Sequence, residues 1–399
     1  MNLLFLTLLY PPKTMDQVSR FSKDGMQNQI NSYQWAYIDG LRQNMGEGED
    51  LNLINSLPVG IFPIRYKKLV LPSWREPGFS ELGSLNLPGL KQWARQVKAT
   101  KAIVNWARKS ASNRQVLVYT LYLPYMQAVA NAKKQIPDLK ATVIVTDLPN
   151  ELGISSGRQG LMKRLEHAMG NKRTELCQAF DGFVLLTHQM EEVLPIQGKN
   201  SMVMEGLILP QAKVYSSPMY STDHPVVLYT GTLNRELGIG TLLDAFKGLS
   251  NCQLWLCGAG DMQEEARQAD QTSANIRYFG VVSQEEAIAL QGNADILINP
   301  RSRAGLYTRY SFPSKTLEYM RSGRPVLCYH LEGIPRDYDP YLVYIRKEGA
   351  QGIREAVEDL LALPKTRREE IGKAAQTYVQ NEKNPRVQCE KLVRFLRGI

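Results

Sequence analysis

The sequence predicts an α/β protein with two doubly wound domains, each built on a mostly parallel β-sheet. Three observations support this fold class. Short apolar runs of strand length alternate with segments of helical periodicity, which is the pattern of βα units. The pattern pauses at residues 209–225, a stretch with three prolines, and then restarts. At 399 residues the chain is also too long for one ordinary hydrophobic core.

Six apolar runs in each half supply the expected strands. In the first half they are Leu3–Leu9, Leu51–Ile54, Val116–Tyr119, Ala141–Thr146, Gly182–Thr187 and Ser201–Met204. In the second half they are Val226–Tyr229, Gln253–Cys257, Ile276–Phe279, Asp295–Ile298, Pro325–Cys328 and Leu342–Ile345. The expected helices between and after them are Ser32–Arg42, Gly89–Arg114, Pro124–Lys134, Gly160–Phe180, Thr241–Gly248, Gln284–Gln291, Ser311–Met320, Gly352–Leu363 and Arg367–Leu396. We expect a long polar loop at Tyr10–Gln29 and assign no regular structure to Pro58–Leu90.

These elements define the expected domains. Residues 1–208 form a first Rossmann-like domain, 209–225 a linker, and 226–365 a second Rossmann-like domain. Residues 366–399 form C-terminal helices, and their return to the first domain is left open. The long loop after the first strand belongs to the carboxyl edge of its sheet, where ligands of such folds bind.

Composition narrows the class of protein. Hydrophobic residues make up 43% and charged residues 22%, as in soluble globular proteins. The net charge of +9 favours anionic partners. The five cysteines are scattered and the four histidines lack metal-ligand spacing, so we expect buried thiols of a reducing compartment and no metal. No apolar run is long enough to span a membrane, and Met1–Tyr10 fits a buried first strand better than a signal peptide.

The segment Gly89–Arg114 contains seven basic residues and no acid, interleaved with tryptophan and aliphatic residues. This pattern predicts a basic amphipathic helix. Two interpretations stay open. The helix docks on anionic lipid, with indoles at the interface, or it is a surface helix with a solvated basic side. A nucleic-acid role has the least support, because no recognisable binding motif is present.

The stretch Ala294–Tyr329 predicts a strand, a polar loop, a helix and another strand. The expected helix start has Pro313 in its first turn and Ser314 as the cap. A helix amino terminus binds anions, and Lys315 adds positive charge there. Glu318, one turn further, can accept hydrogen bonds from a pair of sugar hydroxyls. Phosphate and ribose groups at this spacing indicate a nucleotide, and a capped helix with solvated arginines is the alternative. The arginines of the loop are Arg301, Arg303 and Arg309.

Two further loops follow strands and precede helices, at residues 231–238 and 258–261. Neither has the full G-x-G-x-x-G spacing of dinucleotide folds, and no P-loop motif occurs. The G-x-S-x-G motif is also absent, so a serine hydrolase has no support.

At this point the chain resembles a known family. The second half is similar to the donor domain of retaining family 4 glycosyltransferases, which have the two-domain GT-B fold. The matching segments are YTGTLNRELGI, WLCGAGD, YFGVV, ADILINP and SFPSKTLEYMRSGRPVLCY, and in the first half VIVTDLP and GFVLLTHQM. The F-P-S-K stretch is similar to a subgroup that builds bacterial surface polysaccharides. The resemblance implies two Rossmann-like domains that face each other across a cleft.

The resemblance implies roles for individual residues of the second half. Glu318 matches the glutamate that holds the nucleotide ribose, whereas Tyr310 replaces a glutamate that contacts the transferred sugar. Pro313 and Ser314 belong to the turn at the diphosphate, and Lys315 supplies charge there. Further implied donor contacts come from the loop arginines and from the strand ends, namely Arg301, Arg303, Gly231, Thr232, Arg235, Phe279 and Gly280. Thr232 and Leu237 replace the family's basic pair, and Arg235 is the available substitute.

In the first half, the candidate catalytic residues are Tyr122, which stands near the place of a family histidine beside the reacting carbon, and Asp147, which lies in the TDLP-type stretch. The implied activity is transfer of a sugar from a nucleoside diphosphate sugar to a lipid-linked or glycan acceptor, without a metal cofactor. The implied location is the cytoplasm, peripheral at the inner face of the cell membrane. Two alternatives stay open, a non-catalytic GT-B binding subunit and a nucleotide-sugar epimerase.

Overall fold

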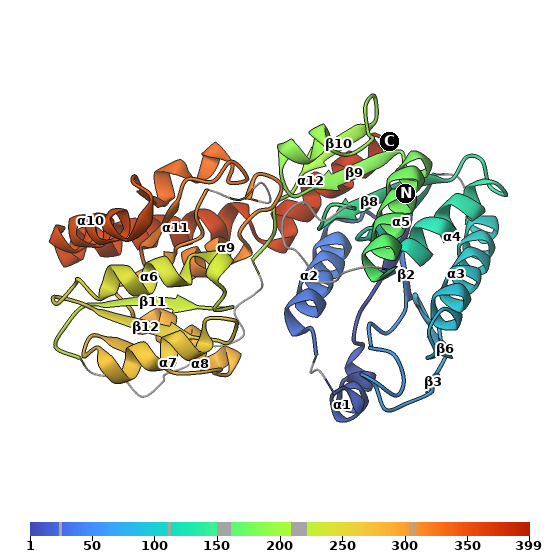
Figure 1. The fold of residues 1–399 in the computed structure, drawn as a ribbon. Helices are drawn as coiled ribbons and strands as arrows, with labels where there is room; N and C mark the ends of the chain where they lie inside the picture. The colour runs from blue at the N-terminus through green and yellow to red at the C-terminus, as the bar shows by residue number, and fades with distance from the viewer. Residues whose placement is uncertain (24–25, 111–112, 150–160, 209–221, 304, 306–307) are drawn as a thin grey trace. The chain divides into compact units, whose positions relative to one another are not determined.

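The computed structural model describes residues 1–23, 26–110, 113–149, 161–208, 222–303, 305 and 308–399, and Figure 1 labels its elements. Packing divides the chain into two compact units. The first is Met1–Leu209 together with Pro385–Ile399, and the second is Pro210–Asn384. Each contains its own parallel sheet with helices around it, which confirms the predicted α/β class with two Rossmann-like domains. Most of the expected linker, residues 209–221, lies outside the described residues.

The first unit is built on an eight-stranded sheet in the order β10-β9-β8-β7-β1-β2-β5-β4. Neighbouring strands run parallel, except that β4 pairs antiparallel with β5 at the edge. The strands are β1 (Asn2–Thr7), β2 (Asp50–Asn55), β4 (Trp74–Glu76), β5 (Phe79–Glu81), β7 (Arg114–Tyr119), β8 (Lys140–Val145), β9 (Gly182–Leu185) and β10 (Asn200–Val203). Both faces of a parallel sheet are covered, which explains why these strands read as continuous apolar runs.

Helices cover the two faces of this sheet (Figure 1). The helices α2 (Asn28–Asn44) and α12 (Pro385–Arg397) pack against each other, as do α3 (Leu90–Lys109) and α4 (Leu123–Lys133). The helix α5 (Leu161–Leu176) packs beside α4. One core cluster joins strand residues to both α2 and α12, and it includes Leu3, Phe5, Leu41, Leu392 and Leu396.

Two segments of the first unit differ from the sequence prediction. The expected loop Tyr10–Gln29 contains a helix, α1 (Pro12–Phe21), whose buried positions are Thr14 and Val18. Only one of these two is apolar, so the helical period was too weak to recognise. The unassigned stretch Pro58–Leu90 contains β4, β5 and a separate two-stranded sheet of β3 (Val70–Leu71) and β6 (Ser84–Leu85). Strands of two or three residues have no measurable alternation in sequence.

The second unit contains a six-stranded parallel sheet in the order β13-β12-β11-β14-β15-β16. Its strands are β11 (Val226–Thr230), β12 (Gln253–Cys257), β13 (Ile276–Tyr278), β14 (Ile296–Asn299), β15 (Val326–Tyr329) and β16 (Val343–Ile345). Its helices are α6 (Ile239–Phe246), α7 (Gln263–Thr272), α8 (Gln284–Asn293), α9 (Ser314–Arg321), α10 (Gly349–Ala362) and α11 (Lys365–Glu382). Strand order reverses between β11 and β14, and ligands of open α/β sheets bind outside the carboxyl ends at such a switch point.

The expected C-terminal helical segment is two helices that belong to different units. The helix α11 packs against α9 in the second unit, and the chain then enters the first unit at Pro385. There α12 is fixed by hydrogen bonds from Asn44 Nδ2 to Arg386 O at 2.7 Å and from Gln115 Nε2 to Leu396 O at 2.9 Å. Arg397 also pairs with Glu49 at 2.7 Å.

All five cysteines are buried and free of disulfides, which confirms the expected buried thiols. Among the described residues no group of histidine, cysteine and carboxylate side chains is arranged to hold a metal ion. Within the same residues, no helix has the length and apolar character needed to cross a bilayer.

Candidate functional site

The candidate site lies at the carboxyl edge of the second sheet, at the switch between β11 and β14. The loop after β11 passes directly over the loop after β12. Gly231 N donates to Cys257 O at 2.8 Å, and Leu233 N donates to Ala259 O at 2.9 Å. Gly258 has a φ of +132°, and a Cβ there would lie 2.8 Å from the Gly231 carbonyl carbon and closer still to its oxygen. Only glycine allows this close approach of two backbones.

Lys315 connects the first turn of α9 to this loop. A Cβ added at Gly231, whose φ is +151°, would lie 2.6 Å from Lys315 Nζ and closer still to Cε. The lysine side chain therefore lies across the bare face of Gly231. This placement brings together two residues that are 84 positions apart in sequence, and it puts an ammonium group beside a helix amino terminus. Both features attract an anion.

The start of α9 differs in detail from the prediction. Pro313 is the N-cap, with extended backbone, and Ser314 is the first helical residue. Ser314 therefore does not cap the helix, and its side chain is exposed. Proline at the cap has no hydroxyl to offer the first N–H groups, and no side chain caps them. The turn at Thr316, whose N–H donates to Pro313 O at 2.8 Å, belongs to the helix itself.

Glu318 is half-buried in a polar network at the end of β11. Its Oε1 accepts a hydrogen bond from Gln291 Nε2 at 2.7 Å, and the same amide lies 3.1 Å from Thr230 Oγ1. Tyr319 OH accepts from Thr230 N at 2.9 Å and donates to Thr230 O at 3.0 Å. Burial raises the pKa of Tyr319 well above its usual value, so it stays a neutral donor. The network fixes the orientation of Glu318 and leaves Oε2 without a partner among the described residues.

Gln291 is a site residue that the sequence prediction missed. It lies near the end of α8, 27 positions before Glu318, and its side chain is almost fully buried. The sequence offers only a weak signal for it, an amide next to Leu290 on the helix that ends just before β14, because a polar group there needs partners only if the fold buries it.

The expected cationic loop is partly neutralised by acids from other segments. Arg303 Nε lies 3.3 Å from Glu348, and Arg309 Nη1 lies 3.2 Å from Glu332. Arg301 donates instead to Ser311 Oγ at 2.6 Å, which ties the loop to the stretch before α9. The sequence showed no acid within the loop, and its partners come from the stretches that follow β15 and β16.

Arg235, the predicted substitute for a basic pair, is an exposed side chain bonded to Glu265 at 3.1 Å. Thr232 is exposed in the same loop, and Tyr310 is half-buried before α9. The remaining predicted donor residues, Phe279 and Gly280, follow β13. Phe279 packs edge-on against Trp255 with ring centroids 5.4 Å apart, and the space beside Gly280 is open.

The two predicted residues of the first unit follow neighbouring strands. Tyr122 comes after β7, where its OH accepts from Arg95 Nη1 at 2.8 Å and donates to Gln92 Oε1 at 2.5 Å. Asp147 comes after β8 and is exposed. The two strand ends are joined by a hydrogen bond of 2.7 Å between the hydroxyls of Thr120 and Thr146.

Two basic residues of the predicted amphipathic helix point into the first unit rather than to solvent. Lys91 and Arg95 are both almost fully buried on α3. Lys91 Nζ donates to Val59 O, and Arg95 Nη2 donates to Leu57 O. Desolvation is the main reason that the pKa of Lys91 falls to about 7. Of the seven basic residues in the predicted helix Gly89–Arg114, Lys91 and Arg95 therefore do not belong to its solvent side, and Arg114 lies in β7 because the helix ends at Lys109.

A buried carboxylate completes the polar groups at this edge of the first sheet. Glu81, at the end of β5, accepts from Asn55 Nδ2 at 2.6 Å and from Leu57 N at 3.0 Å. Asn55 also accepts from Thr7 Oγ1 at 3.0 Å. Burial raises the pKa of Glu81 to about 7, and these hydrogen bonds oppose the rise only in part.

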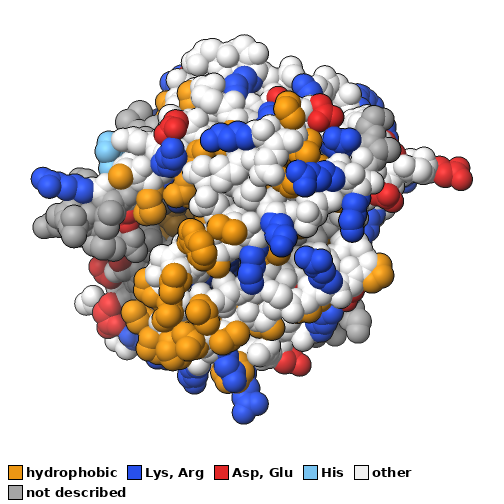
Figure 2. All heavy atoms as spheres, turned by 90° about the vertical axis from the view of Figure 1, so that its right-hand side faces the viewer, with side chains coloured by type: hydrophobic (Ala, Val, Ile, Leu, Met, Phe, Trp, Pro, Cys, Tyr) orange, Lys and Arg blue, Asp and Glu red, His pale blue; other side chains and the backbone are white. Residues whose placement is uncertain are grey.

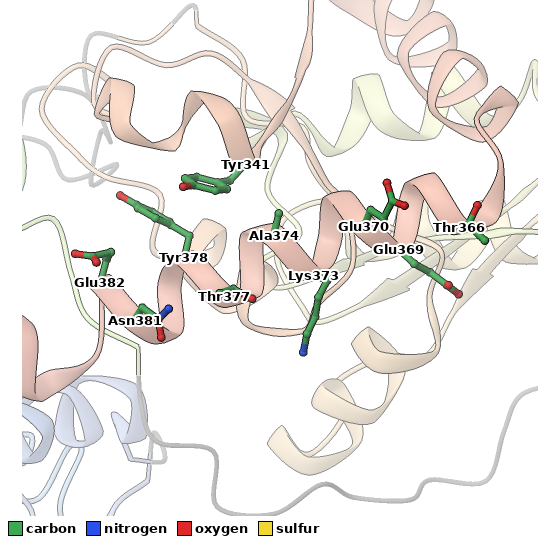
Figure 3. Close-up of a pocket in the computed structure, with 10 residues that line it drawn as sticks. All are labelled: Tyr341, Thr366, Glu369, Glu370, Lys373, Ala374, Thr377, Tyr378, Asn381 and Glu382. Atoms are coloured by element: carbon green, nitrogen blue, oxygen red, sulfur yellow. The ribbon is translucent and has the colours of Figure 1, made fainter.

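A groove of about 790 Å³ lies along α11 in the second unit, with stacked Tyr341 and Tyr378 at one end (Figure 3). Their ring centroids are 4.3 Å apart. The other lining side chains come mostly from exposed turns of α11, including Glu369, Glu370 and Lys373. None of the predicted site residues lines this groove, so volume alone does not locate the chemistry.

Residues 224–362 match the family model described as glycosyl transferases group 1. This span contains every predicted site residue of the second unit, from Gly231 to Glu318. The second unit therefore carries a group 1 glycosyltransferase domain. None of the curated protein sequences matches this chain.

Solved structures match the whole chain in fold. A sucrose-phosphate synthase from Thermosynechococcus elongatus has 14% identity and a TM-score of 0.62, over 100% of this chain and 99% of that one. A structure described as trehalose-6-phosphate from E. coli bound with UDP-2-fluoro glucose has 8% identity and a TM-score of 0.65, with the same coverage. TarM has 11% identity and a TM-score of 0.55, over 83% of this chain and 64% of that one. At such low identity these matches show the fold alone, which is GT-B.

Proposed function

We propose that this protein is a retaining glycosyltransferase that moves a sugar from a nucleoside diphosphate sugar to a lipid-linked glycan acceptor. One observation carries the proposal. Glu318 and Lys315 lie one turn apart on α9, at the strand switch of a sheet whose residues 224–362 match the group 1 glycosyltransferases. A carboxylate and an ammonium at this spacing suit the ribose and the diphosphate of one nucleotide.

Each residue has a physical role in this proposal. Glu318 accepts hydrogen bonds from the ribose hydroxyls, because Gln291 already occupies its Oε1 and orients the carboxylate. Lys315 Nζ contacts the diphosphate, whose charge increases as the sugar–oxygen bond breaks. A positive group fixed in advance at that position lowers the barrier. Pro313, Ser314 and Gly231 place backbone beside the diphosphate, and Phe279 and Gly280 contact the base.

Several residues of this donor site differ from those usual in the family, and each has a role in the proposal. Thr232 stands where a basic group is usual, and Arg235 supplies the charge after it leaves Glu265. Arg301 and Arg303 strengthen the positive field of the loop. Tyr310 contacts the transferred sugar through its hydroxyl in place of a carboxylate.

The first unit supplies the acceptor side of the reaction in this proposal. Tyr122 and Asp147, at the ends of β7 and β8, contact the acceptor or the transferred sugar. The acceptor is a glycan carried on a lipid, so the enzyme works in the cytoplasm at the inner face of the membrane. Residues 209–225 are the proposed linker between residues 1–208 and the donor domain, 226–365.

Titration calorimetry with UDP, GDP and their sugar conjugates tests the donor site. We expect Glu318→Ala and Lys315→Ala each to weaken binding about tenfold or more, since a hydrogen bond to a charged group contributes roughly 1.5–3 kcal/mol. Glu264→Ala and Lys247→Ala remove exposed, ion-paired residues of the same types and serve as matched controls. If no nucleoside diphosphate binds at millimolar concentration, the proposal is wrong.

Product analysis then separates the alternatives. Transfer to extracted lipid-linked glycans supports the transferase. Conversion of the donor without any acceptor indicates an epimerase, and binding without turnover indicates a non-catalytic subunit.

A further inference from the structure

Exposed apolar side chains gather on one part of the first unit. Seven of the thirteen large hydrophobic residues found exposed in the described chain lie between residues 64 and 97. We name them the apolar platform: Ile64, Leu69, Val70, Leu85, Leu90, Trp93 and Val97. Ile64, Val70 and Trp93 are 72%, 61% and 62% exposed, so these are not residues at the margin of a core.

Five platform residues lie on β3, β6 and α3, and Ile64 and Leu69 lie in the loop before β3. Val70 of β3 lies directly opposite Leu85 of β6, and Asn86 N donates to Leu69 O at 2.7 Å beside them. The strand β6 packs against α3. On that helix Leu90, Trp93 and Val97 are spaced by three and four residues and so share one face. Figure 2 views the side on which α3 lies, and hydrophobic side chains gather on its lower part, where Figure 1 places β3 and β6.

The span of the chain that carries the platform has many basic residues and few acids. Between residues 61 and 109 the only acids are Glu76 and Glu81. Glu81 is buried, and Glu76 is paired with Lys13 at 2.7 Å. The exposed basic residues of the same span are Arg65, Lys67, Lys68, Arg75, Lys98, Lys101, Arg108 and Lys109. Figure 2 shows Lys and Arg side chains spread over this side of the molecule.

We propose that the apolar platform docks the protein on an anionic lipid bilayer. Ile64, Val70 and Trp93 enter the boundary between headgroups and acyl chains, and the surrounding lysines contact anionic headgroups. The proposed membrane contact is therefore the apolar platform and not the whole helix Gly89–Arg114. The inference rests on the proposed function only for the lipid-linked acceptor, because docking itself needs neither donor nor acceptor.

Charge and side-chain type favour a membrane over a second copy of the protein or a nucleic acid as the partner of the platform. A second copy bound through the same face would bring two predominantly basic surfaces together, and like charges opposed in this way are unfavourable. A nucleic acid would satisfy the charge, but single-stranded binding surfaces present aromatic rings for base stacking. The platform offers one indole among six aliphatic side chains, which suits acyl chains instead.

Vesicle flotation of the full-length protein tests the proposal. We expect binding to vesicles that contain about one third phosphatidylglycerol, little binding to pure phosphatidylcholine, and a fall in binding as salt shortens the screening length from about 10 Å to about 3 Å. Trp93→Ser with Val70→Ser is expected to reduce partitioning at least tenfold, since each loses a buried apolar side chain. Lys67→Gln with Lys68→Gln is expected to cost about fivefold per lysine.

Matched controls remove similar groups elsewhere in the first unit. Val193→Ser changes an exposed aliphatic residue and Lys140→Gln an exposed lysine, and both should bind vesicles as the unchanged protein does. Circular dichroism and nucleotide binding, measured on the same preparations, show whether each variant is folded and whether the donor site is intact.

Four outcomes would overturn the inference. Equal losses in the platform variants and in the controls would mean that the surface is not specific. Concentration-dependent dimers abolished by Trp93→Ser would assign the platform to a second copy, and binding of DNA without vesicles would assign the basic rim to nucleic acid. Vesicle binding without nucleotide binding would support the membrane inference and contradict the proposed transferase. Nucleotide binding without vesicle binding would contradict the membrane inference and support the donor site.

Discussion

Substitution of Gly231 by alanine tests how the donor site is assembled. The new Cβ would lie 2.6 Å from Lys315 Nζ, a separation that real side chains do not adopt, so the lysine must leave its position. Since the obstructing atoms are the far end of a flexible side chain, the fold itself survives. A backbone φ of +151° adds strain of about 1–3 kcal/mol to the folded state.

The substitution is also expected to weaken nucleotide binding in the protein that stays folded. A displaced ammonium group loses most of a charge-assisted contact that contributes roughly 1.5–3 kcal/mol, so affinity for a nucleoside diphosphate should fall about tenfold. Calorimetry well below the melting temperature measures this loss on folded protein. Gly292→Ala, at a glycine with open space beside it, is the matched control and should leave affinity unchanged.

A double-mutant cycle gives the decisive result. If Gly231→Ala acts through the lysine, the same change in a Lys315→Ala background should cost almost no further affinity, because the displaced group is already absent. Independent, additive losses in the double variant would refute the explanation.

Three further substitutions have expected outcomes. Gly258→Ala should lower the melting temperature by several degrees and leave little soluble protein, because its Cβ would meet the Gly231 backbone, which cannot move aside. Gln291→Leu should weaken nucleotide binding several-fold in calorimetry by releasing Glu318, and unchanged affinity would exclude the orienting role. Glu81 has a folded pKa of about 7, above its value of 4.5 in the unfolded chain, so the folded state binds the proton more tightly. Its contribution to stability is therefore complete below about pH 4.5 and is lost as pH rises through 7, and Glu81→Gln should remove this slope from urea unfolding measured across that range.

Much of the fold was accessible from sequence because the two large sheets are parallel apart from the edge strand β4. Strands buried on both faces appear as short apolar runs, so a run such as Leu3–Leu9 predicts a strand without further information. The helix α1 escaped recognition because its buried stripe contains a threonine, and β3 and β6 because two-residue strands carry no pattern. Such segments acquire their structure from neighbours that sequence order does not reveal.

In the candidate site, too, local features were predictable from the sequence and contacts between distant segments were not. Glu318 and Lys315 were identifiable because they share one helix, so their spacing of three residues fixes their geometry. Contacts between distant segments were not. The proximity of Lys315 to Gly231, the pairing of Arg303 with Glu348, and the inward direction of Lys91 all depend on how loops meet at a sheet edge. Charge counted along the chain therefore overstated the unpaired positive charge in the loop before α9 and at the start of α3.

The passage of the chain back into the first unit has a consequence for how that unit folds. Leu392 and Leu396 belong to the same core cluster as Leu3 and Phe5, so this core joins residues that are more than 380 positions apart in the sequence. Residues 1–209 alone lack the α12 side chains that complete the cluster. We therefore expect that truncation before residue 385 destabilises the first unit, while the second unit keeps all of its own residues, Pro210–Asn384.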